Sequence, residues 1–487
     1  MGILGKLDPA AVWIYFEEIC KIPRLSGNEW QIRRYLIDFA IKNKLDWKED
    51  EVGNILITKE AFEGMENRKT VVLQSHMDMV GEKNADYEHD WNKDPIVPSI
   101  KGNWVTAGST TLGADDGIGI ASQMAILSDR ELKAGKIECL FTVDEETGMT
   151  GAINLKPDFF TGRTLLNLDS EDEGILFIGC AGGMDTVGTM TYKAVPVSNG
   201  AVAMEISLTG LHGGHSGDEI HKGYGNSVKL MNRIIWNLSG LFDISLSRFD
   251  AGNLRNAIPR EAFSTILTTS SRKDSVKKWV DDFSTILSDE FGDLEKEMKI
   301  TCREVAPPSD AMDKESQEKF LNVLACCPHG ALAWSKEMEN LVETSTNLAS
   351  AKLAGNNTIS IITTQRSSIE SSKTEAAAAV ESCLKLAGAK VVHSGGYPGW
   401  KPNMSSEILG LARESYLRLF GRAPLVRAIH AGLECGLIYE KVKGIDMISF
   451  GPTIRGAHTP EEMIEIKSAR MFWDLLVDVV TNMPVMQ

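Results

Sequence analysis

The sequence lacks the features that would direct a protein to a membrane or out of the cell. No apolar run approaches the roughly 18 residues that a membrane-spanning helix needs. The N-terminal segment has no basic stretch followed by an apolar core and a cleavage site, so a secretory signal is not expected. Lys6 stands where a myristoylation motif has Ser or Thr. From these absences we expect a cytoplasmic protein.

Paired cysteines and an excess of basic residues are also missing. The eight cysteines are scattered and none forms a CxxC pair, which favours reduced, buried thiols. The net charge is −16 at pH 7, and phosphate binding requires a basic surface, so no nucleic-acid partner is expected. We interpret the acidity mainly as a contribution to solubility.

The chain is long enough for more than one domain. Its 487 residues exceed what one ordinary core holds, and its 43% hydrophobic and 24% charged content is typical of a soluble globular protein. Alternating strand and helix patterns up to about residue 186 predict an α/β domain with a mostly parallel sheet. Beyond it, a strand, helix, strand, strand unit is followed by a second unit of similar outline, which indicates a divergent duplication.

Acidic residues and histidines cluster where predicted strands end. VVLQSHMDMV (71–80) places His76 and Asp78 on one face of a strand, because side chains alternate along it. FTVDEETGMTGA (141–152) places Glu145 and Glu146 at the carboxyl end of another. The remaining candidates are Asp115 in TLGADDGIGIA (111–121), Asp169 in LLNLDSEDEG (165–174) and His458 in GPTIRGAHTPEEM (451–463). In parallel sheets, ligands gather beyond the carboxyl ends of strands.

These residue types suit a pair of metal ions. Imidazole and carboxylate bind a borderline metal such as Zn²⁺, and one carboxylate can bridge two ions about 3.5–4 Å apart. Two ions need roughly five protein ligands if positions are to remain open for water and substrate. The sequence offers that number: His76, Asp115, Glu146, Asp169 and His458. Glu145 is adjacent to this set and is a candidate general base.

Each motif has a simpler interpretation when taken alone. Three adjacent acids usually mark a solvated turn, and a single histidine in a strand is more often packed or hydrogen-bonded than ligating. Asp115 and Asp116 could simply cap the helix that follows them. The combination of the motifs favours the metal site over these interpretations.

As a set, SHMDMV, GADDGIG, VDEETGMTGA, NLDSEDEG and GAHT resemble the motifs of the dinuclear zinc aminoacylase and carboxypeptidase superfamily. The likeness runs through nearly the whole chain and is strongest to the dipeptidases that cleave Xaa-His. It implies two Zn²⁺ per subunit, for which Co²⁺ or Mn²⁺ could substitute. One ion would bind His76, Asp115 and Asp169, and the other Asp115, Glu146 and His458, with Asp115 as the bridge.

The resemblance also assigns roles beside the metals. Asp78 would orient the His76 imidazole, and Glu145 would take a proton from water and pass it to the leaving amine. It further implies a cis peptide bond between Asp115 and Asp116.

Because His458 completes a set formed by residues 76 to 169, the catalytic domain must be discontinuous. We place it at residues 1–186 and 401–487, with an inserted α+β lid and dimerisation domain at 187–400. By resemblance, His215 crosses the dimer interface and stabilises the oxyanion. The expected substrate-binding residues are His215, Asn256, Arg366 and Gly432, whereas His212, His221 and His430 are expected to be structural.

The predicted activity is zinc-dependent hydrolysis of dipeptides, Xaa-His among them. The protein is expected to be a homodimer that binds dipeptides as substrates and binds neither nucleic acid nor membranes. Two alternatives stay open. One is an amidohydrolase of N-acyl amino acids, because relatives use the same residues for that reaction. The other is a metal-dependent binding or scaffold protein that has lost catalysis, which the presence of Glu145 disfavours.

Overall fold

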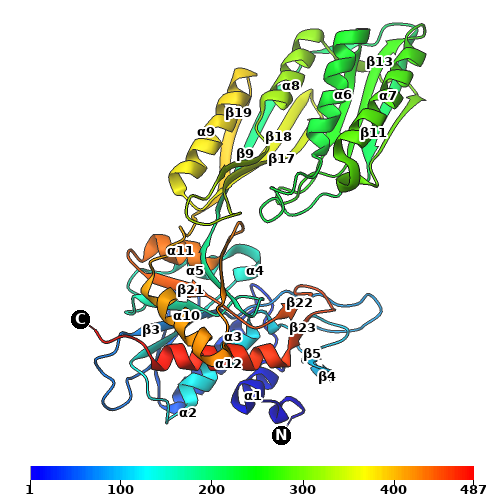
Figure 1. Ribbon diagram of the computed structural model, residues 1–487. Helices are drawn as coiled ribbons and strands as arrows, with labels where there is room; N and C mark the ends of the chain where they lie inside the picture. The colour runs from blue at the N-terminus through cyan, green and yellow to red at the C-terminus, as the bar shows by residue number, and fades with distance from the viewer. Residues whose placement is uncertain (1, 487) are drawn as a thin grey trace. The chain divides into compact units, whose positions relative to one another are not determined.

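The structure, a computed structural model, describes residues 2–486 and forms two compact units. Unit 1 contains the chain up to Cys180, then Trp400–Ala428, and then Leu433 onwards; unit 2 contains Ala181–Gly399 and Ile429–Gly432. The blue N-terminal and red C-terminal parts of the chain therefore belong to the same unit (Figure 1). The sequence placed the divisions after residues 186 and 400, and it did not predict that residues 429–432 belong to unit 2.

A mixed eight-stranded sheet forms the centre of unit 1, in the order β1-β2-β6-β3-β7-β21-β8-β20. Its central strands run parallel and are almost entirely buried, as the predicted α/β fold requires. These are β3 (Val71–His76), β6 (Ile137–Thr142), β7 (Thr164–Asn167) and β21 (Asp446–Ser449). The outer strands are β1 (Asp46–Glu49), β2 (Ile55–Lys59), β8 (Ile175–Cys180) and β20 (Leu425–Ile429).

Helices pack against this sheet through apolar faces. In α12 the buried residues Phe472, Leu475, Leu476 and Val479 are three or four positions apart, which places them on one side of the helix. The helices of unit 1 are α1 (Ala10–Ile19), α2 (Trp30–Asn43), α3 (Ala114–Ser128), α4 (Glu145–Gly148), α5 (Thr150–Asn154), α10 (Glu407–Phe420), α11 (Glu434–Lys441) and α12 (Ile466–Thr481), with a 3₁₀ turn at Leu4–Lys6. Among the described residues, no helix combines the length and apolar character needed to cross a membrane.

A small antiparallel sheet in unit 1 joins distant parts of the chain. Its order is β22 (Ile454–Arg455), β23 (Met463–Glu465), β5 (Trp104–Thr106) and β4 (Ser99–Lys101). The sequence pattern by itself predicts one helix from Glu462 to Thr481, which is wrong at its start, because α12 begins only at Ile466. Met463–Glu465 instead pair with Trp104–Thr106, because tertiary pairing overrides local helix preference. The loop between β22 and β23 carries His458.

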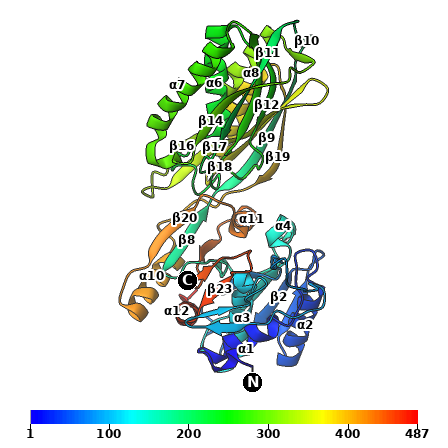
Figure 2. The ribbon, with the colours of Figure 1, turned by 90° about the vertical axis from the view of Figure 1, so that its right-hand side faces the viewer.

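Unit 2 is a nine-stranded antiparallel sheet with four helices against one face (Figure 2). The strand order is β14-β11-β13-β12-β17-β18-β9-β19, with β16 paired to β17, and the apolar side chains of strands and helices form one core. The helices are α6 (Ser227–Phe242), α7 (Lys273–Phe291), α8 (Lys314–Cys326) and α9 (Glu370–Leu386). The strands are β9 (Gly182–Thr191), β11 (Ala201–Thr209), β12 (Ser245–Ala251), β13 (Ala262–Thr269), β14 (Lys299–Val305), β16 (Gly330–Trp334), β17 (Val342–Ala354), β18 (Thr358–Ser367) and β19 (Lys390–Tyr397); β10 (Ala194–Pro196) and β15 (Asp310–Met312) form a separate pair.

The sheet of unit 2 repeats one topology. The elements β11-α6-β12-β13-α7-β14 and β9-α8-β17-β18-α9-β19 follow the same order along the chain, apart from the additional strands β10, β15 and β16. Their spatial orders also match, β12-β13-β11-β14 and β17-β18-β9-β19, and the halves meet where β12 pairs with β17. The sequence predicted two consecutive units. The structure has them nested, since the first half lies between β9 and α8 of the second.

Candidate metal centre

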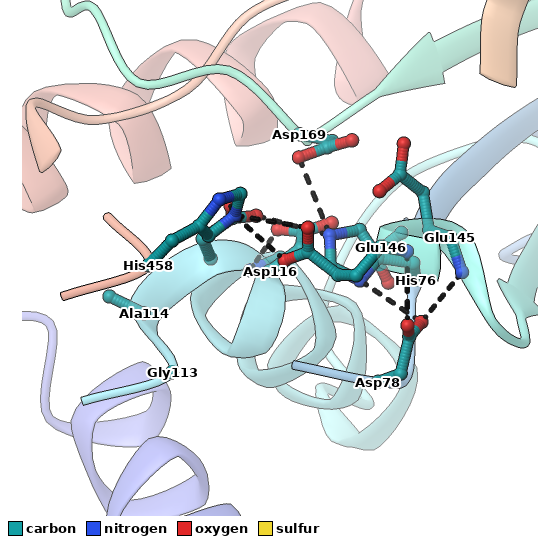
Figure 3. Close-up of polar contacts among 12 residues, drawn as sticks. His76, Asp78, Gly113, Ala114, Asp116, Glu145, Glu146, Asp169 and His458 are labelled. Carbon is teal, nitrogen blue, oxygen red and sulfur yellow. Dashed lines mark hydrogen bonds and ion pairs between the residues drawn. The ribbon is translucent and has the colours of Figure 1, made fainter. Parts of the chain in front are cut away.

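His76 ends β3 and is only 1% exposed. Its Nε2 lies 3.0 Å from Asp115 Oδ1 and 3.6 Å from Asp169 Oδ1, and its Nδ1 lies 3.4 Å from Asp78 Oδ1. Figure 3 shows Asp78 and Asp169 on opposite sides of the His76 ring. A carboxylate beside Nδ1 fixes the tautomer that leaves Nε2 available to a metal ion.

Asp78 also holds the segment that carries the two glutamates. Its carboxylate accepts hydrogen bonds from the backbone N–H groups of Glu145 (3.0 Å) and Glu146 (3.1 Å) and from the Ser26 hydroxyl (2.8 Å). Burial raises the pKa of Asp78, but hydrogen bonding with His76 and with these donors outweighs burial and lowers it to about 2. Asp78 is therefore an anion that anchors the start of α4 and lies beside the His76 imidazole.

Asp115 faces two histidines from the first turn of α3. Its Oδ1 lies 3.0 Å from His76 Nε2, and its Oδ2 lies 3.3 Å from His458 Nε2. The peptide bond between Asp115 and Asp116 is cis, which confirms what the resemblance implied. Since each carboxylate oxygen faces a different imidazole, this side chain has the arrangement that a bridging ligand needs.

Two buried residues that the sequence did not single out hold the turn before α3. Glu462, 2% exposed, accepts hydrogen bonds from the backbone N–H groups of residues 112–114 at 2.7–2.9 Å. Arg24 donates to the carbonyl oxygens of Asp78 (2.6 Å) and Gly113 (2.5 Å) and so links this turn to the segment after β3. Neither residue carries a signal in the sequence, because both act through partners that are remote along the chain.

His458 stands in the loop between β22 and β23 with a left-handed backbone conformation, φ 63°. Its Nε2 lies 3.0 Å from Glu146 and 3.3 Å from Asp115 Oδ2. Figure 3 shows the contact between His458 and Glu146. The structure therefore brings the late loop to the ends of β3, β6 and β7.

The side chains form two overlapping groups of ligand atoms, each within 4.8 Å of one another. One group is His76, Asp115 and Asp169, and the other is Asp115, Glu146 and His458. They have the same members as the two ligand sets that the resemblance implied, with Asp115 common to both. A third group joins Glu145 to His76 and Glu146, so the candidate base lies beside the same atoms.

The charges of the cluster fit a bound cation. Burial, above all, raises the pKa of Asp169 to about 6 and that of Glu145 well above its usual range. Hydrogen bonds with Asp115 and Glu146 raise the pKa of His458 to about 11. Protons bound to imidazole and carboxyl groups thus balance the negative charge of the clustered carboxylates. A bound metal ion would supply this positive charge instead, and the protons would be released. Imidazole and carboxylate donors of this kind suit a divalent metal ion.

Unit 2 contains the other predicted residues. Arg366 on β18 is 6% exposed; its Nη1 donates to the Tyr397 hydroxyl (2.8 Å), and its Nε has no hydrogen-bond partner among the described residues. Burial and then the Arg366 charge lower the pKa of His215, and the same two causes lower that of His430 to about 3. Both histidines are therefore neutral at pH 7, next to one fixed cation.

The loop of His215 is fixed by its own backbone. The His215 Nδ1 accepts from the N–H groups of Gly217 (3.3 Å) and Asp218 (3.2 Å), so the proton of the neutral ring is on Nε2. Asn256 is exposed, and its backbone carbonyl accepts from the backbone N–H of Ser216 (2.8 Å), which places Asn256 beside this loop.

The other histidines of unit 2 pack against neighbours. His430 Nε2 lies 2.8 Å from Ser345 Oγ, and His212 stacks on Tyr224 with ring centroids 4.0 Å apart. His221 meets the Trp334 ring edge-on at 6.0 Å.

A parallel-centred α/β unit whose strand ends carry two overlapping ligand groups, together with an inserted antiparallel unit, has the features of a dinuclear metallopeptidase. The chain belongs to peptidase family M20/M25/M40, whose profile matches residues 72–482. It is 42% identical over 484 residues to the cytosol non-specific dipeptidase of Escherichia coli (strain K12), covering 99% of this chain and 100% of that protein.

Solved structures agree with this assignment. The crystal structure of aminoacylhistidine dipeptidase from Vibrio alginolyticus matches with a TM-score of 0.94 and 41% identity, covering 100% of this chain and 99% of that chain. The aminopeptidase PepT from Bacillus cereus ATCC 10987 shares the fold at 17% identity, with a TM-score of 0.57 over 98% of this chain and 99% of that chain.

Proposed function

We propose that the protein is a zinc-dependent dipeptidase that hydrolyses a range of dipeptides, Xaa-His among them. The observation that carries this proposal is the pair of ligand groups sharing Asp115, with Glu145 beside them. Support comes from the relatives over the full length of the chain, one named a cytosol non-specific dipeptidase and the other an aminoacylhistidine dipeptidase.

His76, Asp115 and Asp169 would hold one Zn²⁺, and Asp115, Glu146 and His458 the other, with Co²⁺ or Mn²⁺ as substitutes. When bound, two such ions supply Lewis acidity for the scissile carbonyl and for a water molecule. Asp78 would keep Nε2 of His76 available to that ion, because its carboxylate lies beside the other ring nitrogen, Nδ1.

Glu145 is the general base in this proposal. Its backbone N–H is fixed by Asp78, and burial raises its pKa well above the usual range of a carboxyl group. A base with a raised pKa accepts a proton from water and holds it long enough to deliver it to the leaving amine.

We assign substrate binding and dimerisation to unit 2. Neutral His215 would donate its Nε2–H to the oxyanion at the site of the partner subunit, and Asn256, Arg366 and Gly432 would contact the substrate. Arg366 has a buried guanidinium group and is therefore the residue that would bind the substrate carboxylate. We further propose that the homodimer acts in the cytoplasm, where the name of the Escherichia coli relative places that protein.

The test is hydrolysis of Ala-His and of its N-acetylated counterpart by the purified protein loaded with Zn²⁺. A dipeptidase cleaves Ala-His and spares the acetylated compound. The reverse preference would identify an amidohydrolase of N-acyl amino acids. Stable metal binding without cleavage of any dipeptide in a panel would contradict the proposal and favour a binding protein.

A further inference from the structure

The Arg366 side chain is held through its Nη1 atom. Its Nη1 donates to the Tyr397 hydroxyl at 2.8 Å, while its buried Nε has no hydrogen-bond partner among the described residues. A guanidinium can bind a carboxylate through either of two edges, and the edge formed by Nε and Nη2 does not include Nη1. A buried cation with an unpaired donor is costly unless an anion meets it. The geometry thus leaves one particular edge for a carboxylate.

Tyr397 is itself fixed along its backbone. It ends β19, where it pairs with Gly183 of β9, and its carbonyl oxygen accepts from Lys373 Nζ at 2.6 Å. Lys373 is only 2% exposed and forms an ion pair with Glu370 at 2.9 Å. The hydrogen bond from the buried Lys373 ammonium group fixes the backbone of Tyr397 and so limits the positions that the Tyr397 ring can adopt.

Two glycines make room for the Tyr397 ring. A Cβ at Gly183 would lie 2.6 Å from Tyr397 Cε1, and a Cβ at Gly432 would lie 2.7 Å from Cε2, both far inside van der Waals contact. Neither glycine has a positive φ, so any residue could adopt these backbone conformations. Space for the ring, and not backbone freedom, therefore requires glycine at both positions.

We propose that Tyr397 is a positioning residue for the substrate: it holds Nη1 of Arg366 so that the opposite edge faces the C-terminal carboxylate of a dipeptide. Gly183 and Gly432 are needed because they admit its ring. The proposal deepens the proposed dipeptidase function and rests on it for the identity of the carboxylate.

The test compares the Zn²⁺-loaded wild type with Tyr397→Phe, which keeps the ring and removes the hydroxyl. The ligands are an Ala-His isostere with CH₂–NH in place of the scissile amide, and the same isostere with a C-terminal carboxamide. We expect Tyr397→Phe to bind the free acid about tenfold more weakly, the lower end for a hydrogen bond to a charged group, and the carboxamide unchanged. With Ala-His as substrate, KM rises about tenfold and kcat stays within about twofold.

Tyr416→Phe is the matched control. The Tyr416 hydroxyl also contacts an arginine, Arg422 Nη2 at 3.0 Å, but in unit 1, so its removal should leave the preference for the acid unchanged. A second variant, Gly432→Ala, should also weaken binding of the acid, because its Cβ would lie 2.7 Å from Tyr397 Cε2 and displace the ring.

Equal loss of acid and carboxamide binding in Tyr397→Phe would show that Tyr397 only supports the fold, and would overturn the proposal. The proposal would also be overturned if the wild type bound the two isosteres equally, or if Tyr397→Phe kept the full preference for the free acid over the carboxamide. Because binding needs no turnover, failure of the dipeptidase function is distinguishable: a wild type that prefers the acid isostere but cleaves no dipeptide contradicts that function alone.

Discussion

Glu462 offers a sharp test of how the metal centre is held together. Its Oε2 accepts from the backbone N–H groups of Leu112 (2.8 Å) and Gly113 (2.9 Å), and its Oε1 from those of Ala114 (2.7 Å) and Asp115 (3.3 Å). Glu462→Gln keeps the size of the side chain but replaces one oxygen by an NH₂ group. Two N–H donors then face another donor in a buried site, so two of these hydrogen bonds are lost.

The cost follows from these contacts. A hydrogen bond to a charged group contributes about 1.5–3 kcal/mol, so losing two costs about 3–6 kcal/mol. This is a large part of the roughly 5–15 kcal/mol by which proteins are usually stable. A loss of that size corresponds to a fall of roughly 10 °C in melting temperature. Since the turn carries Asp115, we also expect less bound metal after dialysis against a weak chelator.

The assay is thermal unfolding followed by metal analysis of the same samples. Glu461→Gln is the matched control, because Glu461 is the adjacent acid and is exposed. It should change neither quantity. An unchanged melting temperature and metal content in Glu462→Gln would refute the reasoning, because the turn would then not depend on the carboxylate.

Four further outcomes are expected. Glu145→Ala should abolish turnover and leave two metal ions bound, because the base is not needed as a ligand; metal analysis and a dipeptide assay check it. Asp115→Ala should lower the occupancy of both ions, whereas Asp169→Ala should lower one more than the other, measured by metal content per subunit. Inactive Glu145→Ala and His215→Ala subunits, mixed and exchanged, should regain up to about half of the activity of a normal dimer, since one site per heterodimer has both residues intact. Burial, and to a smaller extent the charge of Lys229, lowers the pKa of His329 to about 4. In the unfolded chain the same histidine takes up a proton near pH 6.5, so acid favours the unfolded chain. The contribution of neutral His329 to the free energy of unfolding is present above pH 6.5 and is lost as the pH falls toward 4. The loss is about 2 kcal/mol between pH 7 and 5. Urea unfolding of the wild type and of His329→Gln at these pH values would measure it.

Each outcome has a clear opposite. Loss of both ions in Glu145→Ala would make that residue a ligand or a structural element. Equal, single-ion losses in Asp115→Ala and Asp169→Ala would remove the bridge. No recovery in verified heterodimers would mean that His215 acts in its own subunit or does not act. An identical decline of stability with acid in wild type and His329→Gln would assign that decline to other groups.

The sequence predicts those parts of the site that follow from strand ends. His76, Glu146 and Asp169 come directly after buried apolar runs, and the carboxyl ends of parallel strands share one edge of a sheet, so these residues could be expected together. Asp115 lies in the first turn of α3 and His458 in a loop, and here only the resemblance indicated their place. The parallel core of unit 1 was predictable for the same reason.

Contacts between distant segments were not predictable from local pattern. Nothing in the pair Glu461 and Glu462 shows which carboxylate is buried, because the N–H groups that decide it lie some 350 residues away. The glycine-rich run before Tyr397 has the composition of a turn, yet β19 extends across it: the pairing with β9 is interrupted at the two glycines and resumes at Tyr397. In both cases tertiary partners override local preference.

The nested repeat of unit 2 sets an order in which the parts of the molecule can be completed during synthesis. Within residues 2–486, the strands β11 to β14 pair with one another and, at β12, with β17, so this half can close as soon as residue 305 has emerged. β9 is made earlier but must wait for β18 and β19, and β21 takes its place between β7 and β8 later still. At synthesis rates of about 5–20 residues per second, β8 spends roughly 15–50 s without its neighbour β21. The metal centre, which needs His458 from beyond β21, therefore cannot form until nearly the whole chain has been made.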